Sequence, residues 1–135
     1  MNNINTHYSM KELIIEKTNS TPSVEFNALT GHLRIDGRSI PENPGDFFER
    51  LLDWIEQYYK NPADVTRFDL NLEYVNSGSS KYLLGIFRIL KRKQDEGYKC
   101  IINWYYEEDD EAIFSLGEHY KTSVRLPFNL IEYIQ

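Results

Sequence analysis

The chain has 135 residues, of which 41% are hydrophobic and 14% aromatic, and its formal net charge is -6. This length suits one domain with its own core, and the acidic charge argues against nucleic acid or an anionic membrane as the main partner. The single cysteine excludes an internal disulfide, and the lack of a signal-peptide pattern or a long apolar run predicts a soluble, cytoplasmic protein without membrane insertion.

Three short strands are predicted after a polar segment, residues 1–10, that we expect to be flexible. They lie within residues 12–18, 23–28 and 32–40. The second and third are joined by Leu29, Thr30 and Gly31, a hairpin-length link in which glycine suits a positive φ. We expect the three strands to form an antiparallel meander and residues 11–135 to form a single domain.

The clearest helix is predicted within residues 41–62. Asn43 can cap it, Pro44 suits its first position, and Pro62 ends it. Its apolar residues recur at helical spacing and give one wide face, made of Phe47, Leu51, Trp54, Ile55 and Tyr58.

Strict alternation predicts a strand over residues 66–75. One face carries Phe68, Leu70, Leu72 and Tyr74, and the other carries Arg67, Asp69, Asn71 and Glu73. Because one face is polar, we expect helices to cover mainly one side of the sheet, as in a two-layer sandwich.

The rest of the chain alternates helix and strand. A helix is predicted over 79–96, a strand over 98–106 with Cys100 as a buried thiol, and a shorter helix within 107–120. A final strand lies within 123–134, where Pro127 indicates a sheet edge. This β-α-β-α-β portion predicts parallel strands with right-handed crossovers, so the whole sheet is expected to be mixed.

Motifs for nucleotide binding and for hydrolase chemistry are absent. The three histidines, His7, His32 and His119, have no metal-ligand spacing, and we expect no cofactor and no metal. The acidic run from Glu107 to Glu111 favours a helix start, although it could also hold a divalent cation. An enzyme that uses the acidic strand face, with Asp69, remains an alternative.

Hydroxyl groups gather where the strand at 66–75 passes into the helix at 79–96. Asn76 is expected to turn the chain, and Ser77 or Ser79 to cap the helix. One cap needs only one hydroxyl, so a second role is open. A helix N-terminus tolerates the roughly -1.5 to -2 charges of a phosphoryl group. A residue modified there would act as a switch without any catalytic group in this chain.

Several stretches together resemble the SiaC family of bacterial regulatory phosphoproteins, over residues 20–135. The most specific are Gly37–Asn43, with the sequence GRSIPEN, and Leu72–Lys81, with the sequence LEYVNSGSSK. The resemblance implies a STAS-like α/β fold, related to that of anti-sigma-factor antagonists, which agrees with the predicted element order.

The resemblance also implies a non-enzymatic, partner-switching function. In such proteins a cognate serine/threonine kinase adds a phosphate and a PP2C-type phosphatase removes it, and the unphosphorylated form activates a diguanylate cyclase, which makes cyclic di-GMP. The phosphoacceptor position corresponds to Ser77, with Ser79 as second choice because Gly78 departs from the family pattern. The candidates for partner binding are Asn76, Gly78, Ser79, Ser80 and Lys81, and a contact role for residues 41–43 is open. The alternatives are an anti-sigma-factor antagonist that binds a kinase-like anti-sigma factor, and a purely structural subunit.

Overall fold

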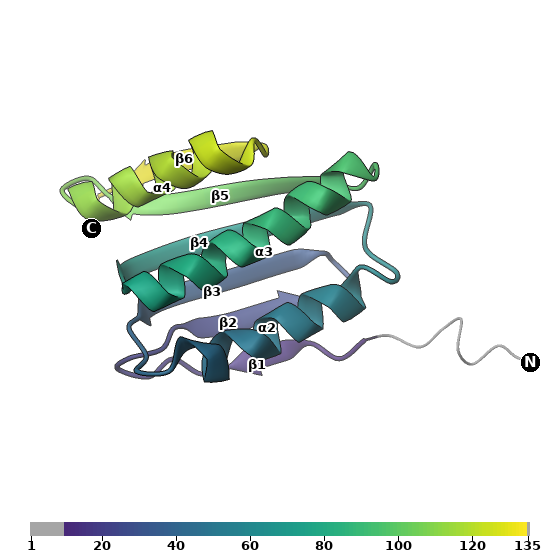
Figure 1. Ribbon diagram of the computed structural model, residues 1–135, viewed down its shortest axis with the longest axis horizontal. Coiled ribbons are helices and arrows are strands. Elements are labelled where there is room, and N and C mark those ends of the chain that lie inside the picture. Colours follow the sequence, from purple (N-terminus) through teal and green to yellow (C-terminus); the bar gives the residue numbers. More distant parts are fainter. Residues whose placement is uncertain (1–9, 135) are drawn as a thin grey trace, which may run out of the picture.

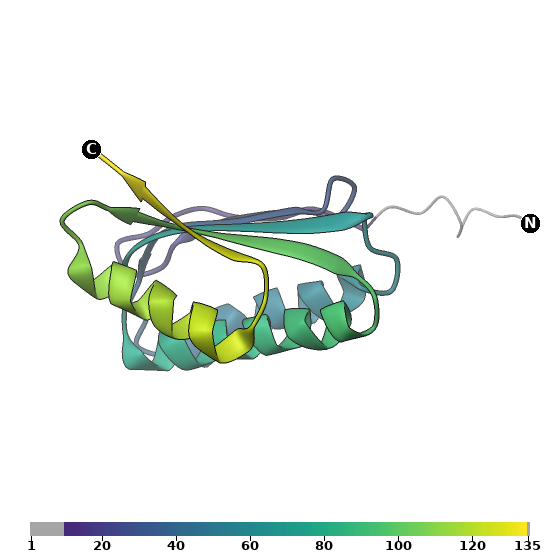
Figure 2. The same cartoon turned by 90° about the horizontal axis from the view of Figure 1, so that it is seen from above.

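The computed structural model describes residues 10–134, so the expectation of flexibility over residues 1–10 falls almost wholly outside the described residues. The described chain forms one six-stranded sheet, and its three helices pack on one face of that sheet (Figures 1 and 2). Strands follow one another across the sheet in sequence order, from β1 to β6. The predicted element order and the two-layer arrangement are confirmed.

The first half of the sheet is the predicted antiparallel meander. It consists of β1 (Leu13–Ile15), β2 (Ser23–Asn27) and β3 (His32–Ser39). Gly31, in the link between β2 and β3, has the expected positive φ, 72°. A Cβ atom at Gly31 would lie 2.6 Å from the carbonyl oxygen of Val65, so glycine is also required by the close approach of the next strand.

The second half of the sheet is parallel, and its strands run parallel to β3. It consists of β4 (Val65–Val75), β5 (Lys99–Glu107) and β6 (Phe128–Tyr133). β6 lies at the edge of the sheet, as Pro127 predicts. From β3 to β6 each strand is added on the same side of the one before it. Because all the crossover connections are expected to be right-handed, the connecting helices lie on the same face of the sheet.

The connecting helices are α2 (Pro44–Tyr58), α3 (Ser77–Asp95) and α4 (Glu111–Val124). The predicted apolar face of α2 is buried, and Phe48 adds to it. α4 was expected within residues 107–120, and it does start at Glu111, the last residue of the acidic run, but four residues later than the start of the predicted range. Glu107 ends β5, Asp110 caps the helix, and the helix continues to Val124 because Tyr120 and Val124 extend its buried face. None of the helices in residues 10–134 is long and apolar enough to cross a membrane.

Trp104, on β5, lies fully buried where α4 meets the sheet. Its indole Nε1 donates a hydrogen bond of 2.9 Å to the carbonyl oxygen of Ile113, and its ring packs against those of Tyr120 and Phe128. A Cβ atom at Gly117 would lie 2.5 Å from the indole Cδ1. The absence of a side chain at Gly117 therefore lets α4 lie directly against the indole.

The polar face of the sheet is less exposed than the alternation suggests. Asp69 is 6% exposed, because its carboxylate accepts a hydrogen bond of 2.8 Å from Asn103 and lies 2.7 Å from Nε2 of His32. Glu73 is instead paired with Arg38 at 3.3 Å. Asp69 and Glu73, the acids of the strand face considered for an enzyme, thus bind different partners. Residues 10–134 contain no cluster of three or more His, Cys, Asp or Glu residues that could hold a metal.

Candidate functional site

The candidate site lies at the edge of the sheet where β3 and β4 end and α3 begins (Figure 1). α3 starts at Ser77, two residues before the predicted start, and its cap is Asn76 rather than a serine. The Asn76 side-chain oxygen accepts a hydrogen bond of 2.9 Å from the backbone N–H of Ser79. The expectation that Ser77 or Ser79 caps the helix is wrong, because the amide side chain already satisfies the backbone donor that a serine would take.

Asn76 also fixes the segment that follows β3. Its backbone N–H donates to the carbonyl oxygen of Ser39 at 2.9 Å, and its side-chain amide donates to the carbonyl oxygen of Pro41 at 3.0 Å. Asn43 occupies the cap position of α2, but its side chain makes no capping hydrogen bond. The GRSIPEN stretch is therefore joined to the start of α3 by Asn76.

Replacing Asn76 with alanine is expected to lower the free energy of unfolding by about 1–2 kcal/mol, since one capping bond and one bond to Pro41 are lost. Asn76→Asp keeps the capping acceptor and loses only the donor, so it should be less destabilising. Urea unfolding of the two variants checks this. Equal stability of wild type and Asn76→Ala would contradict the assigned role.

The three serines of this stretch differ in exposure. Ser77 is exposed, whereas Ser79 is fully buried with its hydroxyl 2.9 Å from that of Ser39. Ser80 is half-buried, and its hydroxyl lies 2.8 Å from the hydroxyl of Tyr120, which donates to the Ser80 carbonyl oxygen. Burial raises the pKa of Tyr120 to about 12, which keeps its hydroxyl protonated and able to donate. Ser77 is therefore the one serine of the three that is exposed.

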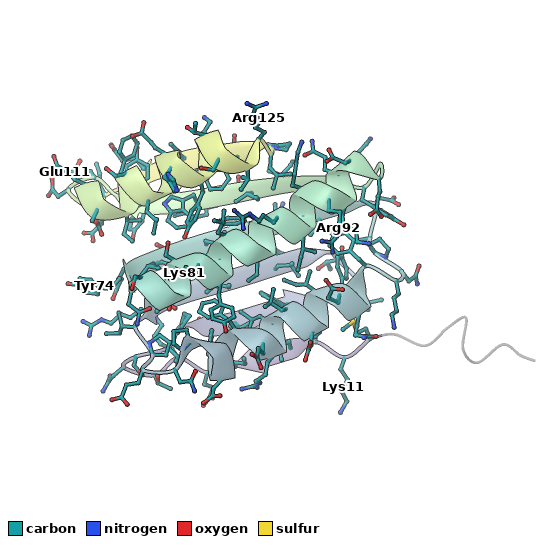
Figure 3. The ribbon with its side chains drawn as sticks, in the orientation of Figure 1. Lys11, Tyr74, Lys81, Arg92, Glu111 and Arg125 are labelled. Carbon is teal, nitrogen blue, oxygen red and sulfur yellow. The ribbon has the colours of Figure 1, made fainter. Side chains whose placement is uncertain are left out.

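Gly78 and Lys81 complete the stretch. Gly78 lies in the first turn of α3. A Cβ atom there would lie 2.7 Å from the Pro44 ring, so glycine lets the starts of α2 and α3 meet. Lys81 is exposed, one helical turn after Ser77, and forms no ion pair within residues 10–134 (Figure 3). Its ammonium group is the nearest cation along α3 to the Ser77 hydroxyl.

A bulge in β4 adds an aromatic surface that the alternating pattern does not predict. Gly37 pairs with Leu72, but Ser39 pairs with Val75, so Glu73 and Tyr74 together oppose one residue of β3. The extra residue turns Tyr74 out of the core, leaving it 58% exposed (Figure 3). The Arg38 guanidinium lies 5.3 Å from the centre of the Tyr74 ring. The prediction that Tyr74 shares the apolar face of Phe68, Leu70 and Leu72 is therefore wrong.

An open depression of about 480 Å³ lies beside this aromatic pair. It is lined by Arg38, Glu73, Tyr74, Glu107, Asp109 and Asp110. Carboxylates outnumber cations there, so the edge that carries Ser77 is acidic on the side facing β5. The site combines an exposed serine hydroxyl with a helix N-terminus, and these features suit recognition by another protein.

An exposed serine at the start of a helix is in a position where an added phosphate can be accommodated, as a regulatory phosphoprotein requires. The model of the SiaC family regulatory phosphoproteins matches residues 15–133. The chain belongs to this family, and the resemblance noted in its sequence is confirmed.

Known relatives share both sequence and fold. An uncharacterized protein of Pseudomonas aeruginosa strain UCBPP-PA14 is 29% identical over 119 residues, which cover 88% of this chain and 94% of that protein. The crystal structure of apo-SiaC from Pseudomonas aeruginosa is 29% identical, with a TM-score of 0.84 over 90% of this chain and 99% of the other. A further structure, of the diguanylate cyclase SiaD in complex with its activator SiaC from the same organism, matches with 28% identity and a TM-score of 0.85 over the same shares of the two chains.

Proposed function

We propose that this chain is a phosphorylation-controlled regulator that binds and activates a diguanylate cyclase when it is unphosphorylated. The observation that carries the proposal is the exposure of Ser77 alone among the three serines at the start of α3. The activator role described for the related SiaC, in complex with its cyclase, supports the choice of target.

The surroundings of Ser77 favour it as the phosphoacceptor. The first backbone N–H groups of a helix have no partner within the helix, and together with the positive dipole end they stabilise an added phosphate. Lys81 supplies a cation one turn away. Modification of Ser79 would instead require the helix start to open, because its hydroxyl is fully buried against Ser39.

Phosphate on Ser77 would add roughly 1.5–2 negative charges and considerable bulk to the first turn of α3. A target that packs on this turn would then bind more weakly, through repulsion and the cost of desolvating the phosphate. The fold need not change, since the switch requires only that the target has different affinities for the two forms. A cognate kinase and a PP2C-type phosphatase in the cytoplasm would set the balance between them.

Intact-mass and peptide-mapping spectrometry on protein from its own cell tests the acceptor. We expect one phosphate, lost in Ser77→Ala and kept in Ser80→Ala, which removes a neighbouring hydroxyl as a matched control. A phosphate that persists in Ser77→Ala would contradict the assignment and move the site to Ser79 or Ser80.

An activity assay then tests the target. Unmodified protein and Ser77→Ala are expected to raise cyclic di-GMP synthesis by a purified diguanylate cyclase of the same cell. The phosphorylated protein is expected to leave this synthesis unchanged. Activation by both forms alike would exclude a switch. Specific binding of a kinase-like anti-sigma factor, without any effect on cyclases, would favour the anti-sigma-factor antagonist.

A further inference from the structure

Charge is distributed unevenly between α3 and the rest of the molecule. Within Ser77–Asp95 there are five cationic side chains and one carboxylate, which gives the helix a net charge of +4 in a chain whose net charge is -6. The cations are Lys81, Arg88, Lys91, Arg92 and Lys93. The remainder of the chain therefore carries -10, and α3 is a basic element on an acidic protein.

A groove of about 440 Å³ lies between α3 and α4. Leu84 and Val124 supply its apolar lining, and the basic groups around them come from Arg88 and Lys91 on α3 and from Arg125 after α4. Lys91 is neutralised by Asp95 at 3.2 Å. Arg88 and Arg125 form no ion pair within residues 10–134, so two cations beside an apolar surface lack an acidic partner.

Arg125 holds an unusual backbone conformation at the end of α4 (Figure 3). Its φ of 55° and ψ of 47° place it in the left-handed region, and it is the only non-glycine residue of the described chain with positive φ. Glycine is the usual residue after a helix in this conformation, because a side chain there is strained. An arginine in this strained conformation, at the rim of the groove, points to a use for its side chain.

We infer that this groove, with Leu84, Arg88, Val124 and Arg125, binds an acidic amphipathic helix of a target protein. An apolar stripe on such a helix would pack on Leu84 and Val124, and glutamate or aspartate beside the stripe would pair with the two unpartnered arginines. The apolar lining and the acidic remainder of the chain favour a protein segment over a nucleic acid or an anionic membrane, which would meet the -10 charge on the rest of the molecule.

The inference deepens the proposed function, and its link to phosphorylation rests on that function. Ser77 and Arg88 lie on the same helix, eleven residues apart, which corresponds to about 16 Å along the axis. A target helix of ordinary length can therefore lie along α3 from the groove to the first turn. A phosphate on Ser77 would face that acidic helix as a like charge and displace it.

The test uses the full chain and a fluorescent synthetic helix with leucine along one face and glutamate beside it. Anisotropy is expected to show binding that weakens with added salt and falls about tenfold in Arg88→Glu/Arg125→Gly. Arg125→Gly suits the backbone conformation, so it should not lower the thermal midpoint. Lys121→Glu, exposed on α4 outside the groove, is the matched control and should bind as the wild type does.

Several results would overturn the inference. These are unchanged binding in the double variant, equal loss in Lys121→Glu, or equal binding of a peptide with lysine in place of glutamate. Displacement of the bound peptide by a short DNA duplex or by phosphatidylglycerol vesicles, at lower concentration than the unlabelled peptide requires, would also overturn it by assigning the groove to a different class of partner.

The cyclase assay separates this inference from the proposed function. If the double variant loses peptide binding and also cyclase activation, the groove is part of the docking surface. If it still activates the cyclase fully, the inference fails and the proposed function stands. If the wild type activates no cyclase, the proposed function fails, whereas the peptide result is unaffected.

Discussion

Replacing Trp104 with alanine is expected to lower the free energy of unfolding by about 3–5 kcal/mol, a large part of the total stability of a domain of this size. The indole is fully buried, its N–H is bonded to the Ile113 carbonyl oxygen, and α4 rests on it at Gly117. Truncation leaves a cavity between β5 and α4 and removes the hydrogen bond that joins the indole to the Ile113 carbonyl oxygen.

Urea unfolding measures the effect as a fall in the midpoint at nearly constant slope. Trp104→Phe is the matched control. It keeps a ring against Tyr120 and Phe128 but loses the indole N–H, and should be destabilised by a smaller amount. A midpoint for Trp104→Ala close to that of the wild type would show that α4 contributes little to the cooperative fold.

Raising the pH above about 9 is expected to destabilise the protein, because buried cysteine and tyrosine groups lose protons more readily in the unfolded state. Burial raises the pKa of Cys100 from 9.0 to about 11 and that of Tyr120 from 10.0 to about 12, and it raises the pKa of Tyr59 as well. The folded state therefore keeps protons that the unfolded state releases. These contributions are complete below pH 9 and are lost as the pH rises through the folded pKa values.

The expected loss is about 3 kcal/mol from Tyr120 alone between pH 10 and pH 12, because each unit of pKa shift corresponds to about 1.4 kcal/mol. Urea unfolding across this range measures the fall in the free energy of unfolding with pH. This fall should be smaller by that amount in Tyr120→Phe than in the wild type. Tyr98→Phe, at an exposed tyrosine, is the matched control. A wild-type profile that stays level from pH 9 to pH 12 would contradict the burial of these groups.

Much of the fold could be predicted from periodicity. The alternation over residues 66–75, the helical spacing of Phe47, Leu51 and Trp54, and the glycine at position 31 each reflect a requirement of the local backbone that can be recognised in the sequence. α4 was predicted too early in the chain, since it runs to Val124 and its contact with the sheet depends on Gly117. A glycine lowers the helical signal, although here it is the residue that allows the helix to approach Trp104.

The site was harder to predict in detail, because its parts come from pairings between distant segments. Tyr74 leaves the core through a bulge opposite Arg38, and no pattern within β4 alone shows a change of register. Ser79 is buried because Ser39, forty residues earlier, meets it at the end of the neighbouring strand. The family resemblance indicated Ser77. The burial of Ser79 and the contact of the half-buried Ser80 with Tyr120 supply a physical reason to prefer Ser77.

The sequential order of strands across the sheet has a consequence for how the chain folds. Each strand pairs with the strand that precedes it in the sequence, so no later segment has to insert between two strands that have already paired. Contacts between elements close in sequence shorten the loops that must close and favour rapid folding. Assembly can follow synthesis from the N-terminal meander onward, and the edge that presents Ser77 needs only β3, β4 and the helices α2 and α3 to form.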